Sequence, residues 1–336
     1  ALPAQLKRKG LKVHGSNLCN EIHLPTNEDR TAVCCLSSVN LEHYDQWKHT
    51  PMVRDLVTML DNVLEYFIEN APSSLSRAVY SATQERSIGI GAMGFHNLLQ
   101  SRMIPFESND ASKLNIEIFN YIKSEAKDVS NSLADSRGPA PDMAPLMVRH
   151  SHLLAVAPNA SCGILLRTSP SIEPNKAYAY THRTRAGSFL VKNKYLEKYL
   201  DKIKHNTSEV WANIITNGGS VQHLAFLEDN IKAVFKTSFE LDQSWVIKHA
   251  SDRQKYVCQG QSVNLFFPAG AEKKYVKDAH ILAWESGLKG LYYLRTEAKV
   301  RAENVSKEVE ENKLKYDKTT IIYGKPNCPN CEMAKA

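Results

Sequence analysis

The sequence lacks the features that define several common classes of protein. No run of apolar residues approaches the roughly 20 residues that a membrane span needs, and the first residues do not have the pattern of a secretory signal peptide. The seven cysteines are odd in number and irregularly spaced, which argues against the disulfide scaffold of a secreted protein. The histidines show no metal-ligand spacing, and no segment is repeated. We therefore expect a cytoplasmic protein without its own metal centre, in which each cysteine is a candidate for redox chemistry.

The chain does have the composition of a folded protein with a modest positive charge. It contains 336 residues, of which 43% are hydrophobic, so it has enough apolar side chains for one large or two ordinary domains. The net charge of +6 is compatible with anionic ligands but does not by itself indicate direct binding to nucleic acid.

Apolar periodicity predicts alternating strands and helices. The expected strands are 31–40, 87–93, 152–157, 262–267 and 290–294, and the expected helices are 52–68, 114–133, 231–249 and 272–286. Strands that are separated by long helical crossovers predict an α/β fold with a parallel sheet and helices outside it.

The composition changes after Arg295, so two regions are predicted, 1–295 and 296–336. The segment 296–318 is dense in glutamate and lysine, which is typical of a solvated helix or a flexible linker. The chain then ends with the pair Cys328 and Cys331 in a CxxC motif. Such a pair suits dithiol exchange, because the motif can lower the pKa of one thiol. Half of a zinc site is the alternative, but no second pair of cysteines follows.

An amide, a thiol and a carboxylate alternate near the start of the chain, at Asn17, Cys19 and Glu21. In an extended segment, alternate side chains share one face, so these three groups would point together. The amide would orient a hydroxyl group, the thiol would carry out hydrogen-atom or nucleophilic chemistry, and the carboxylate would accept a proton. The alternative is a polar loop around a buried cysteine.

Five stretches, in this order along the chain, resemble motifs of the large, catalytic subunit of class I ribonucleotide reductases. They are Ser16–Ile22, Cys34–Leu41, Ile88–Gly94, Pro170–Pro174 and Gly290–Tyr293. The resemblance covers roughly residues 16 to 295. It implies a ten-stranded α/β barrel with a central finger loop, and the five expected strands would make half of such a barrel.

The resemblance also implies the roles of individual residues. Cys19 would be the thiyl-radical site that removes the 3′ hydrogen of the ribose, and Glu21 would be the base on the 3′ hydroxyl group. Asn17 would position the substrate hydroxyl groups. Cys34 would be one of two cysteines that reduce the 2′ position and form a disulfide. Two adjacent tyrosines would relay the radical to Cys19; they are Tyr292 and Tyr293.

A turn at residues 158–162 corresponds to the part of the family where backbone amides at a helix N-terminus hold the substrate diphosphate. The residues are Pro158, Asn159, Ala160, Ser161 and Cys162. Family members usually have a hydroxyl group where Cys162 stands, and a plain strand-to-helix turn is the alternative interpretation. The tail bearing Cys328 and Cys331 would re-reduce the active-site disulfide, although residues 321–335 are also similar to the start of a glutaredoxin.

The resemblance begins in the middle of the family's sequence. The family's first redox cysteine lies upstream of the finger loop, and residues 1–15 contain no cysteine. We therefore expect activity only with a partner that carries the N-terminal half of the large subunit. A metal-containing small subunit would supply the radical, a ribonucleoside diphosphate would be the substrate, and thioredoxin or glutaredoxin would be the external reductant. The alternatives are an inactive fragment that binds its partner, or a thiol–disulfide carrier that acts through its CxxC motif.

Two other signals are better explained by packing. Gly89, Gly91 and Gly94 form a GxGxxG pattern, but no apolar strand precedes it, so we expect close barrel packing rather than a dinucleotide site. Cys35 follows Cys34 directly and should face the opposite side of its strand, toward the core.

Overall fold

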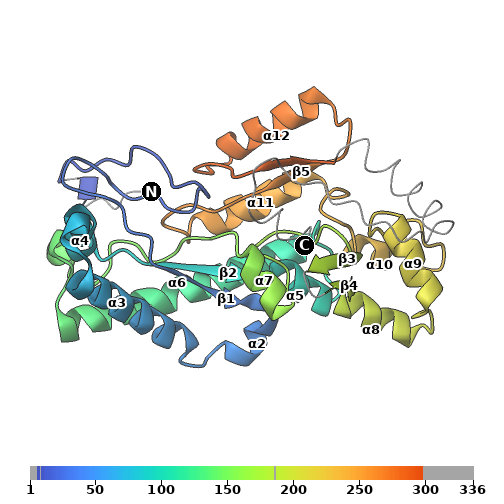
Figure 1. Ribbon diagram of the computed structural model, residues 1–336, viewed down its shortest axis with the longest axis horizontal. Helices are drawn as coiled ribbons and strands as arrows, with labels where there is room; N and C mark the ends of the chain where they lie inside the picture. Colours follow the sequence, from blue (N-terminus) through green and yellow to red (C-terminus); the bar gives the residue numbers. More distant parts are fainter. Residues whose placement is uncertain (1–5, 8, 185–186, 298–336) are drawn as a thin grey trace, which may run out of the picture. The chain divides into compact units, whose positions relative to one another are not determined.

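The computed structural model describes residues 6–7, 9–184 and 187–297 of the chain (Figure 1). The predicted linker and tail therefore lie outside the described residues from position 298 onward, and so do Cys328 and Cys331. In the described part of the chain, none of the helices combines the length and the hydrophobicity that a membrane span requires. The elements, in chain order, are β1 (Leu36–Asn40), η1 (Leu41–His43), α2 (Tyr44–Trp47), α3 (Met52–Asn70), η2 (Ser73–Leu75), α4 (Ser76–Glu85), β2 (Gly89–Met93), α5 (Phe95–Ser101), α6 (Asn109–Arg137), η3 (Pro141–Leu146), α7 (Ala160–Leu166), β3 (Ala179–Thr184), β4 (Gly187–Lys192), α8 (Lys194–Lys202), α9 (Ser208–Thr216), α10 (Asp229–Val234), α11 (Gln243–Gln254), β5 (Leu265–Phe267), α12 (Lys273–Glu285) and β6 (Leu294–Thr296).

Parallel strand segments lie next to one another in the order in which they occur along the chain. β1 pairs with β2, and β5 pairs with β6, in both cases in parallel. Between these pairs, single parallel bridges join Ile90 of β2 to Leu154, and Val156 to Gln261 in the segment that leads into β5. Between paired strands, long helical connections carry the chain back to the end of the sheet at which the previous strand began, as parallel pairing requires. The expected α/β fold is confirmed, and the five expected strand positions take part in it.

The third expected strand, 152–157, is less regular than the sequence predicts. Its backbone N–H groups at Leu153 and Leu154 donate to the Sγ atom of Cys258, at 3.1 and 3.3 Å, rather than to a neighbouring strand. A side chain therefore takes the place of part of the ladder, and only two bridges form. The first and last expected strands are also shorter than predicted, since β1 begins at Leu36 and β6 at Leu294.

The glycines of β2 allow the neighbouring strands to approach closely. A Cβ atom on Gly89 would lie 2.1 Å from the side chain of Leu36 in β1 and 2.9 Å from that of Ala155. A Cβ atom on Gly91 would lie 2.7 Å from the carbonyl oxygen of Ala155. These glycines serve packing between strands, as the sequence analysis expects.

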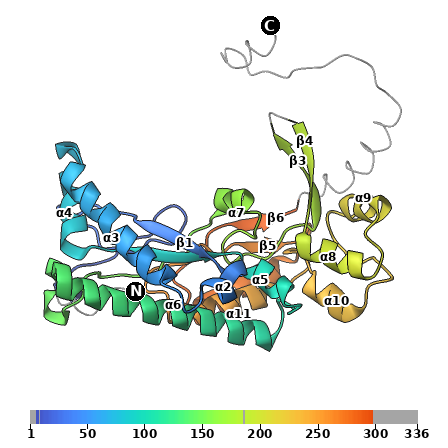
Figure 2. The ribbon, with the colours of Figure 1, turned by 90° about the horizontal axis from the view of Figure 1, so that it is seen from below.

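Long amphipathic helices cover the strands, and most of them agree with the apolar periodicity. α3 and α6 pack together, and α6 packs in turn on α11 (Figure 2). The hydroxyl group of Ser108 caps α6 by accepting from the backbone N–H of Ala111. Gly138, with a φ angle of 84°, ends the helix before Pro139, where the sequence predicts its end.

The expected helix 231–249 is wrong, because the structure has two helices there, α10 and α11. Between them the carboxylate of Glu240 accepts from the backbone N–H of Thr237 at 2.8 Å and stabilises a turn. Asp242 then starts α11 anew, since its side chain accepts from the backbone N–H of Ser244. The apolar pattern continues across this break and so conceals it.

A second core lies in residues 178–235, where the sequence analysis predicted only the helix that begins at residue 231. β3 and β4 form an antiparallel hairpin, which is followed by α8, α9 and α10 (Figure 2). Their buried apolar side chains form a cluster that is separate from the main core and includes Tyr178, Trp211 and Phe235. The indole nitrogen of Trp211 and the hydroxyl group of Tyr178 both have hydrogen-bond partners, as buried polar atoms require.

Asp61, in the middle of α3, joins three parts of the fold electrostatically. Its side chain is fully buried and accepts hydrogen bonds from Arg86 after α4, Arg137 at the end of α6, and Arg149. Burial alone would raise the pKa of Asp61, but hydrogen bonds from His150 and Arg149 and the charge of Arg86 hold it well below its usual range. The carboxylate is therefore ionised, and the surrounding guanidinium groups compensate its negative charge.

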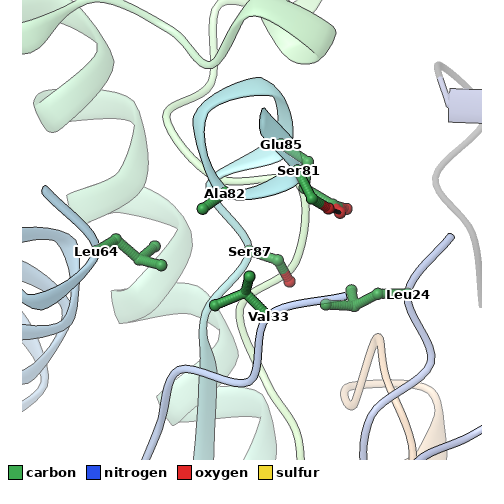
Figure 3. Close-up of a pocket in the computed structure, with 7 residues that line it drawn as sticks. All are labelled: Leu24, Val33, Leu64, Ser81, Ala82, Glu85 and Ser87. Carbon is green, nitrogen blue, oxygen red and sulfur yellow. Dashed lines mark hydrogen bonds between the residues drawn. The ribbon is translucent and has the colours of Figure 1, made fainter. Parts of the chain in front are cut away.

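Glu85, at the end of α4, lies beside a narrow apolar void (Figure 3). The void is lined by Leu24, Val33, Leu64, Ser81, Ala82, Glu85 and Ser87. Glu85 is 1% exposed, and its carboxyl group accepts from the hydroxyl groups of Ser81 at 3.0 Å and Ser151 at 3.4 Å. Burial raises the pKa of Glu85 to about 7, although these hydrogen bonds and the charge of Arg30 oppose the change.

Replacing Asp61 by asparagine should lower the free energy of unfolding by about 3–5 kcal/mol, because it leaves buried guanidinium groups without their counter-charge. Urea denaturation followed by circular dichroism measures this change. Asp45→Asn is the matched control, since its ion pair with Arg102 at 2.7 Å is largely exposed and should contribute at most about 1 kcal/mol. Equal effects of the two substitutions would contradict the role given to Asp61.

Replacing Glu85 by glutamine should stabilise the protein at pH 8 but much less at pH 5. The folded chain keeps the proton of Glu85 up to about pH 7, whereas the unfolded chain releases it at the ordinary pKa of a glutamate. Stability therefore falls as the pH rises between these two values. Glutamine keeps the hydrogen bonds without a charge, so the gain at pH 8 should be about 2–3 kcal/mol. The measurement is the free energy of unfolding of the variant and of the parent at pH 5 and at pH 8. If the difference between the two proteins were the same at both pH values, this explanation would be wrong.

Candidate active site

The segment that contains Asn17, Cys19 and Glu21 is a tight turn, so the extended conformation expected from the alternation is wrong. The carbonyl oxygen of Asn17 accepts from the backbone N–H of Asn20 at 3.1 Å, and Asn20 has a φ angle of 65°. Leu18, at the tip, is 87% exposed. The side-chain oxygen of Asn17 also accepts from the backbone N–H of Ile22 at 3.0 Å and closes the turn. A turn, rather than strand periodicity, therefore places Cys19 and Glu21, and the hydroxyl group of Ser262 donates to the carbonyl oxygen of Cys19 and to the carboxylate of Glu21.

Gly260 and Gly290 pack closely against the turn, and the sequence analysis did not identify either glycine as part of the site. A Cβ atom on Gly260 would lie 2.2 Å from the carbonyl oxygen of Asn20, and one on Gly290 would lie 2.6 Å from its carboxamide. The backbone N–H of Gly260 also donates to the carbonyl oxygen of Glu21 at 2.7 Å. The finger therefore fits between two backbone surfaces that have no side chains.

Cys19 meets the two tyrosines that lie 273 residues further along the chain. Its Sγ atom lies 3.4 Å from the hydroxyl oxygen of Tyr292. The rings of Tyr292 and Tyr293 are stacked, with centroids 3.9 Å apart and planes tilted by 33°. Hydrogen bonding to Cys19 and then to Tyr293 raises the pKa of Tyr292, so this phenol stays protonated at neutral pH. A continuous path of hydrogen-bonding groups thus joins Tyr293, Tyr292 and Cys19.

Glu21 and Cys34 lie near the same thiol. Glu21 is buried, and its carboxylate accepts from the hydroxyl group of Ser262 at 3.3 Å. The side chain of Cys34 opens to solvent, yet desolvation by the surrounding protein, and then electrostatic interactions with Glu21 and Cys19, raise its pKa to about 11. Cys34 is therefore a neutral thiol near pH 7, a form that donates hydrogen rather than attacking as a thiolate.

Cys35 lies in the core, as its position next to Cys34 predicts. It is 7% exposed, and its thiol donates to the carbonyl oxygen of Leu60 in α3 at 3.6 Å. Burial, followed by electrostatic interactions with Cys34 and Asp61, raises the pKa of Cys35 to about 11. The two adjacent cysteines thus face different environments.

The expected turn at residues 158–162 leads into α7 and includes the first residues of that helix. Asn159 has a φ angle of 52°, and its side-chain amide donates to the hydroxyl group of Ser38 and to the carbonyl oxygen of Ala92. These bonds tie the turn to β1 and β2. α7 begins at Ala160 without a side-chain cap, and Ser161 and Cys162 in its first turn are exposed.

Ser262 and Asn264 also belong to this site, and the sequence analysis did not identify them. Both stand at alternate positions of the otherwise apolar strand segment that leads into β5, so they share one face. Polar residues at alternate positions of a buried strand were the available signal. The carboxamide of Asn264 links the expected motif 170–174 to the tyrosines, since it bonds to Glu173 and to the backbone of Tyr293.

Several known proteins are similar in sequence to this chain. Residues 4–145 and 147–294 match the family described as "Ribonucleotide reductase, barrel domain". The "Putative ribonucleoside-diphosphate reductase large subunit" of Frog virus 3 (isolate Goorha) is 54% identical over 322 residues, which are 95% of this chain and 57% of that protein. The "Ribonucleoside-diphosphate reductase large subunit" of Invertebrate iridescent virus 6 is 49% identical over 304 residues, which are 89% of this chain and 32% of that protein.

A solved structure shares the fold. The class Id ribonucleotide reductase alpha subunit of Actinobacillus ureae superposes with a TM-score of 0.84 at 38% sequence identity, and the match covers 91% of this chain and 57% of that one. The chain thus spans little more than half the length of this structure and of the Frog virus 3 protein.

Replacing Gly260 by alanine should displace the finger turn and destabilise the protein by about 1–3 kcal/mol, because the new methyl group overlaps backbone that has no room to move. Gly15→Ala is the control, because Gly15 lies just before the finger in the chain and a Cβ atom there meets nothing within 4 Å. Thermal and urea unfolding of the two variants measure the difference. A Gly260→Ala protein as stable as Gly15→Ala would show that the turn is not tightly enclosed.

Proposed function

Because the chain belongs to the ribonucleotide reductase family, matching its barrel domain over almost all of the described residues, we propose that it forms the finger-loop half of a ribonucleoside-diphosphate reductase catalytic subunit. The observation that carries this proposal is the contact of 3.4 Å between the Cys19 thiol and the Tyr292 phenol, with Tyr293 stacked behind. A thiol in contact with a protonated phenol suits hydrogen-atom transfer, in which a proton and an electron move together.

The proposed radical path runs from Tyr293 to Tyr292 to Cys19. A tyrosyl radical at Tyr292 takes the hydrogen atom of the Cys19 thiol, so the phenol is restored and a thiyl radical remains on sulfur. The short Sγ–oxygen distance supports this step, since hydrogen transfer needs the two heavy atoms in hydrogen-bond contact. The enclosure of the finger between backbone surfaces suits a radical that must avoid water and side reactions.

The proposed reduction then uses the other groups of the site. The Cys19 radical takes the hydrogen from the 3′ carbon of the ribose, and Glu21 accepts the proton of the 3′ hydroxyl group. The 2′ hydroxyl group leaves as water with a proton from a thiol. Cys34 and a second thiol supply two electrons and two protons in total and become a disulfide, and Cys19 finally returns the hydrogen to the 3′ carbon.

The protonated state of Cys34 supports its part in this sequence. Desolvation and electrostatic interactions with Glu21 and Cys19 raise its pKa to about 11, so it enters the reaction as S–H and has a proton to give. Asn17 is proposed to orient the substrate through its side-chain nitrogen, because its side-chain oxygen is already bonded to Ile22. The N-terminal turn of α7, at residues 158–162, is proposed to hold the diphosphate, since it is uncapped and exposed.

The proposal includes partners. The second thiol would come from the other half of the catalytic subunit, and a metal-containing small subunit would generate the radical. Cys328 and Cys331, which lie outside the described residues, would pass electrons from thioredoxin or glutaredoxin to the disulfide. The alternatives, an inactive partner-binding fragment or a thiol–disulfide carrier, predict no role for the contact between Cys19 and Tyr292.

Replacing Tyr292 by phenylalanine should abolish turnover, because the ring stays while the exchangeable phenolic hydrogen is lost. The measurement is reduction of a ribonucleoside diphosphate by this chain assembled with the N-terminal half of a catalytic subunit and a small subunit, with dithiothreitol as reductant. The loss should be at least about 10²-fold, the lower range for a group that takes part in proton transfer.

Tyr66→Phe is the control for this substitution. Its side chain is 70% exposed on α3, so loss of its hydroxyl group should leave both turnover and assembly unchanged. Near-normal turnover in Tyr292→Phe would refute the radical path, and no turnover in the parent assembly would refute the proposed function.

A further inference from the structure

Glu173 interacts electrostatically with Lys176 and Arg295, and these three charged groups take no part in the reduction proposed above. Glu173 belongs to the motif 170–174, Lys176 follows it, and Arg295 stands two residues after Tyr293. Glu173 is 6% exposed, whereas Tyr293 is 45% exposed. A buried carboxylate thus lies next to the outer, more exposed tyrosine of the pair.

Asn264 connects Glu173 to Tyr293 through a directional bridge. Its side-chain nitrogen donates to the carboxylate of Glu173 at 2.5 Å, and its side-chain oxygen accepts from the backbone N–H of Tyr293 at 2.9 Å. An amide has one donor end and one acceptor end, so the carboxylate determines which end faces the tyrosine. If the amide turned over, its nitrogen would face the N–H of Tyr293, and both bonds would be lost.

The surroundings of Glu173 act on its pKa in opposite directions. Burial raises its pKa, but the positive charges of Lys176 and Arg295 and the hydrogen bond from Asn264 oppose the change. Arg295 also lies over the ring of Tyr293, with its Cζ atom 4.9 Å from the centroid. The same guanidinium group therefore contacts the ring and balances the carboxylate that anchors the backbone.

An exposed aromatic pair needs such an anchor. Stacking between two rings is weak on its own, and Tyr293 is only partly covered by the rest of the protein. We infer that Glu173, acting through Asn264, is a positioning residue that holds Tyr293 in register on Tyr292. This inference rests on the relay role proposed for the two tyrosines. Neither Glu173 nor Asn264 touches Cys19 or exchanges hydrogen in this scheme.

The test reverses the polarity of the bridge. Asn264→Asp replaces the donor by an oxygen that faces the Glu173 carboxylate, so the bridge should open at high pH. It should close again as the pH falls, when one carboxyl group takes up a proton and becomes a donor. In the double variant Glu173→Gln/Asn264→Asp, the glutamine donates to the aspartate, which still accepts from Tyr293, so the bridge should be restored at every pH.

The position of the ring is measured in the full 336-residue chain with 3-fluorotyrosine at position 293. The ¹⁹F resonance of the parent should differ from that of the urea-unfolded chain because Tyr292 shields it. In Asn264→Asp it should move toward the unfolded value at pH 8 and return at lower pH, whereas the double variant should match the parent throughout. Glu173→Leu, which removes the acceptor, is a second variant in case Asn264→Asp does not fold; it should show the same displacement without the pH dependence.

Turnover is measured in the reconstituted assembly with ordinary tyrosine. Asn264→Asp should lower kcat about 10²-fold with KM unchanged, as expected when a reacting group is misplaced by about 1 Å, and the double variant should recover it. Asp278→Asn on α12 is the control. The ion pair of Asp278 with Lys274 is exposed and has no part in the proposed site, so kcat should not change. A native ¹⁹F position in folded Asn264→Asp at pH 8 would overturn the inference, and so would a displaced ring with undiminished kcat. An inactive parent assembly would count against the proposed function alone. The ¹⁹F measurement of the ring position would still decide whether Glu173 and Asn264 position Tyr293.

Discussion

The site depends on one steric constraint, the close approach of the finger turn to the backbone at Gly260 and Gly290. A side chain at either glycine would overlap Asn20, and the thiol of Cys19 would then stand away from Tyr292. Because hydrogen-atom transfer requires direct contact, a displacement of about 1 Å matters more here than in a site that binds through charge. Positions without side chains are therefore as much part of this site as the thiol itself.

Ionic hydrogen bonds also join the helices that cover the strands. Asp61 holds α3 to the ends of α4 and α6, so the helices behind the strands are joined by ionic hydrogen bonds as well as by apolar packing. The strands themselves are short, and the segment near Leu154 is held partly by the sulfur of Cys258. Stability thus comes chiefly from the helices, while the strand ends carry the reactive groups.

Electrostatics divides the site into two parts that suit different tasks. Desolvation and the charge of Glu21 keep the thiol of Cys34 protonated, which favours chemistry by hydrogen transfer. At Tyr293, Arg295 lies over an exposed ring and interacts electrostatically with Glu173. The first environment protects reactive hydrogens, whereas the second orients a side chain that would otherwise move in water. The chain spans 57% of the Frog virus 3 protein and 57% of the Actinobacillus ureae alpha subunit.

The amino-acid sequence by itself determined the α/β class, the long helices α3, α6 and α12, and the motifs that contain Cys19, Cys34 and Tyr292, because local periodicity and short motifs are encoded by neighbouring residues. It did not reveal the turn at residues 17–20, since the alternation of polar groups there resembles a strand. Only the tertiary structure brought Cys19 to Tyr292, Glu21 to Ser262, and Asn264 between Glu173 and Tyr293. These contacts join residues far apart in the chain, and such pairings are decided by packing and close approach, which no local pattern records.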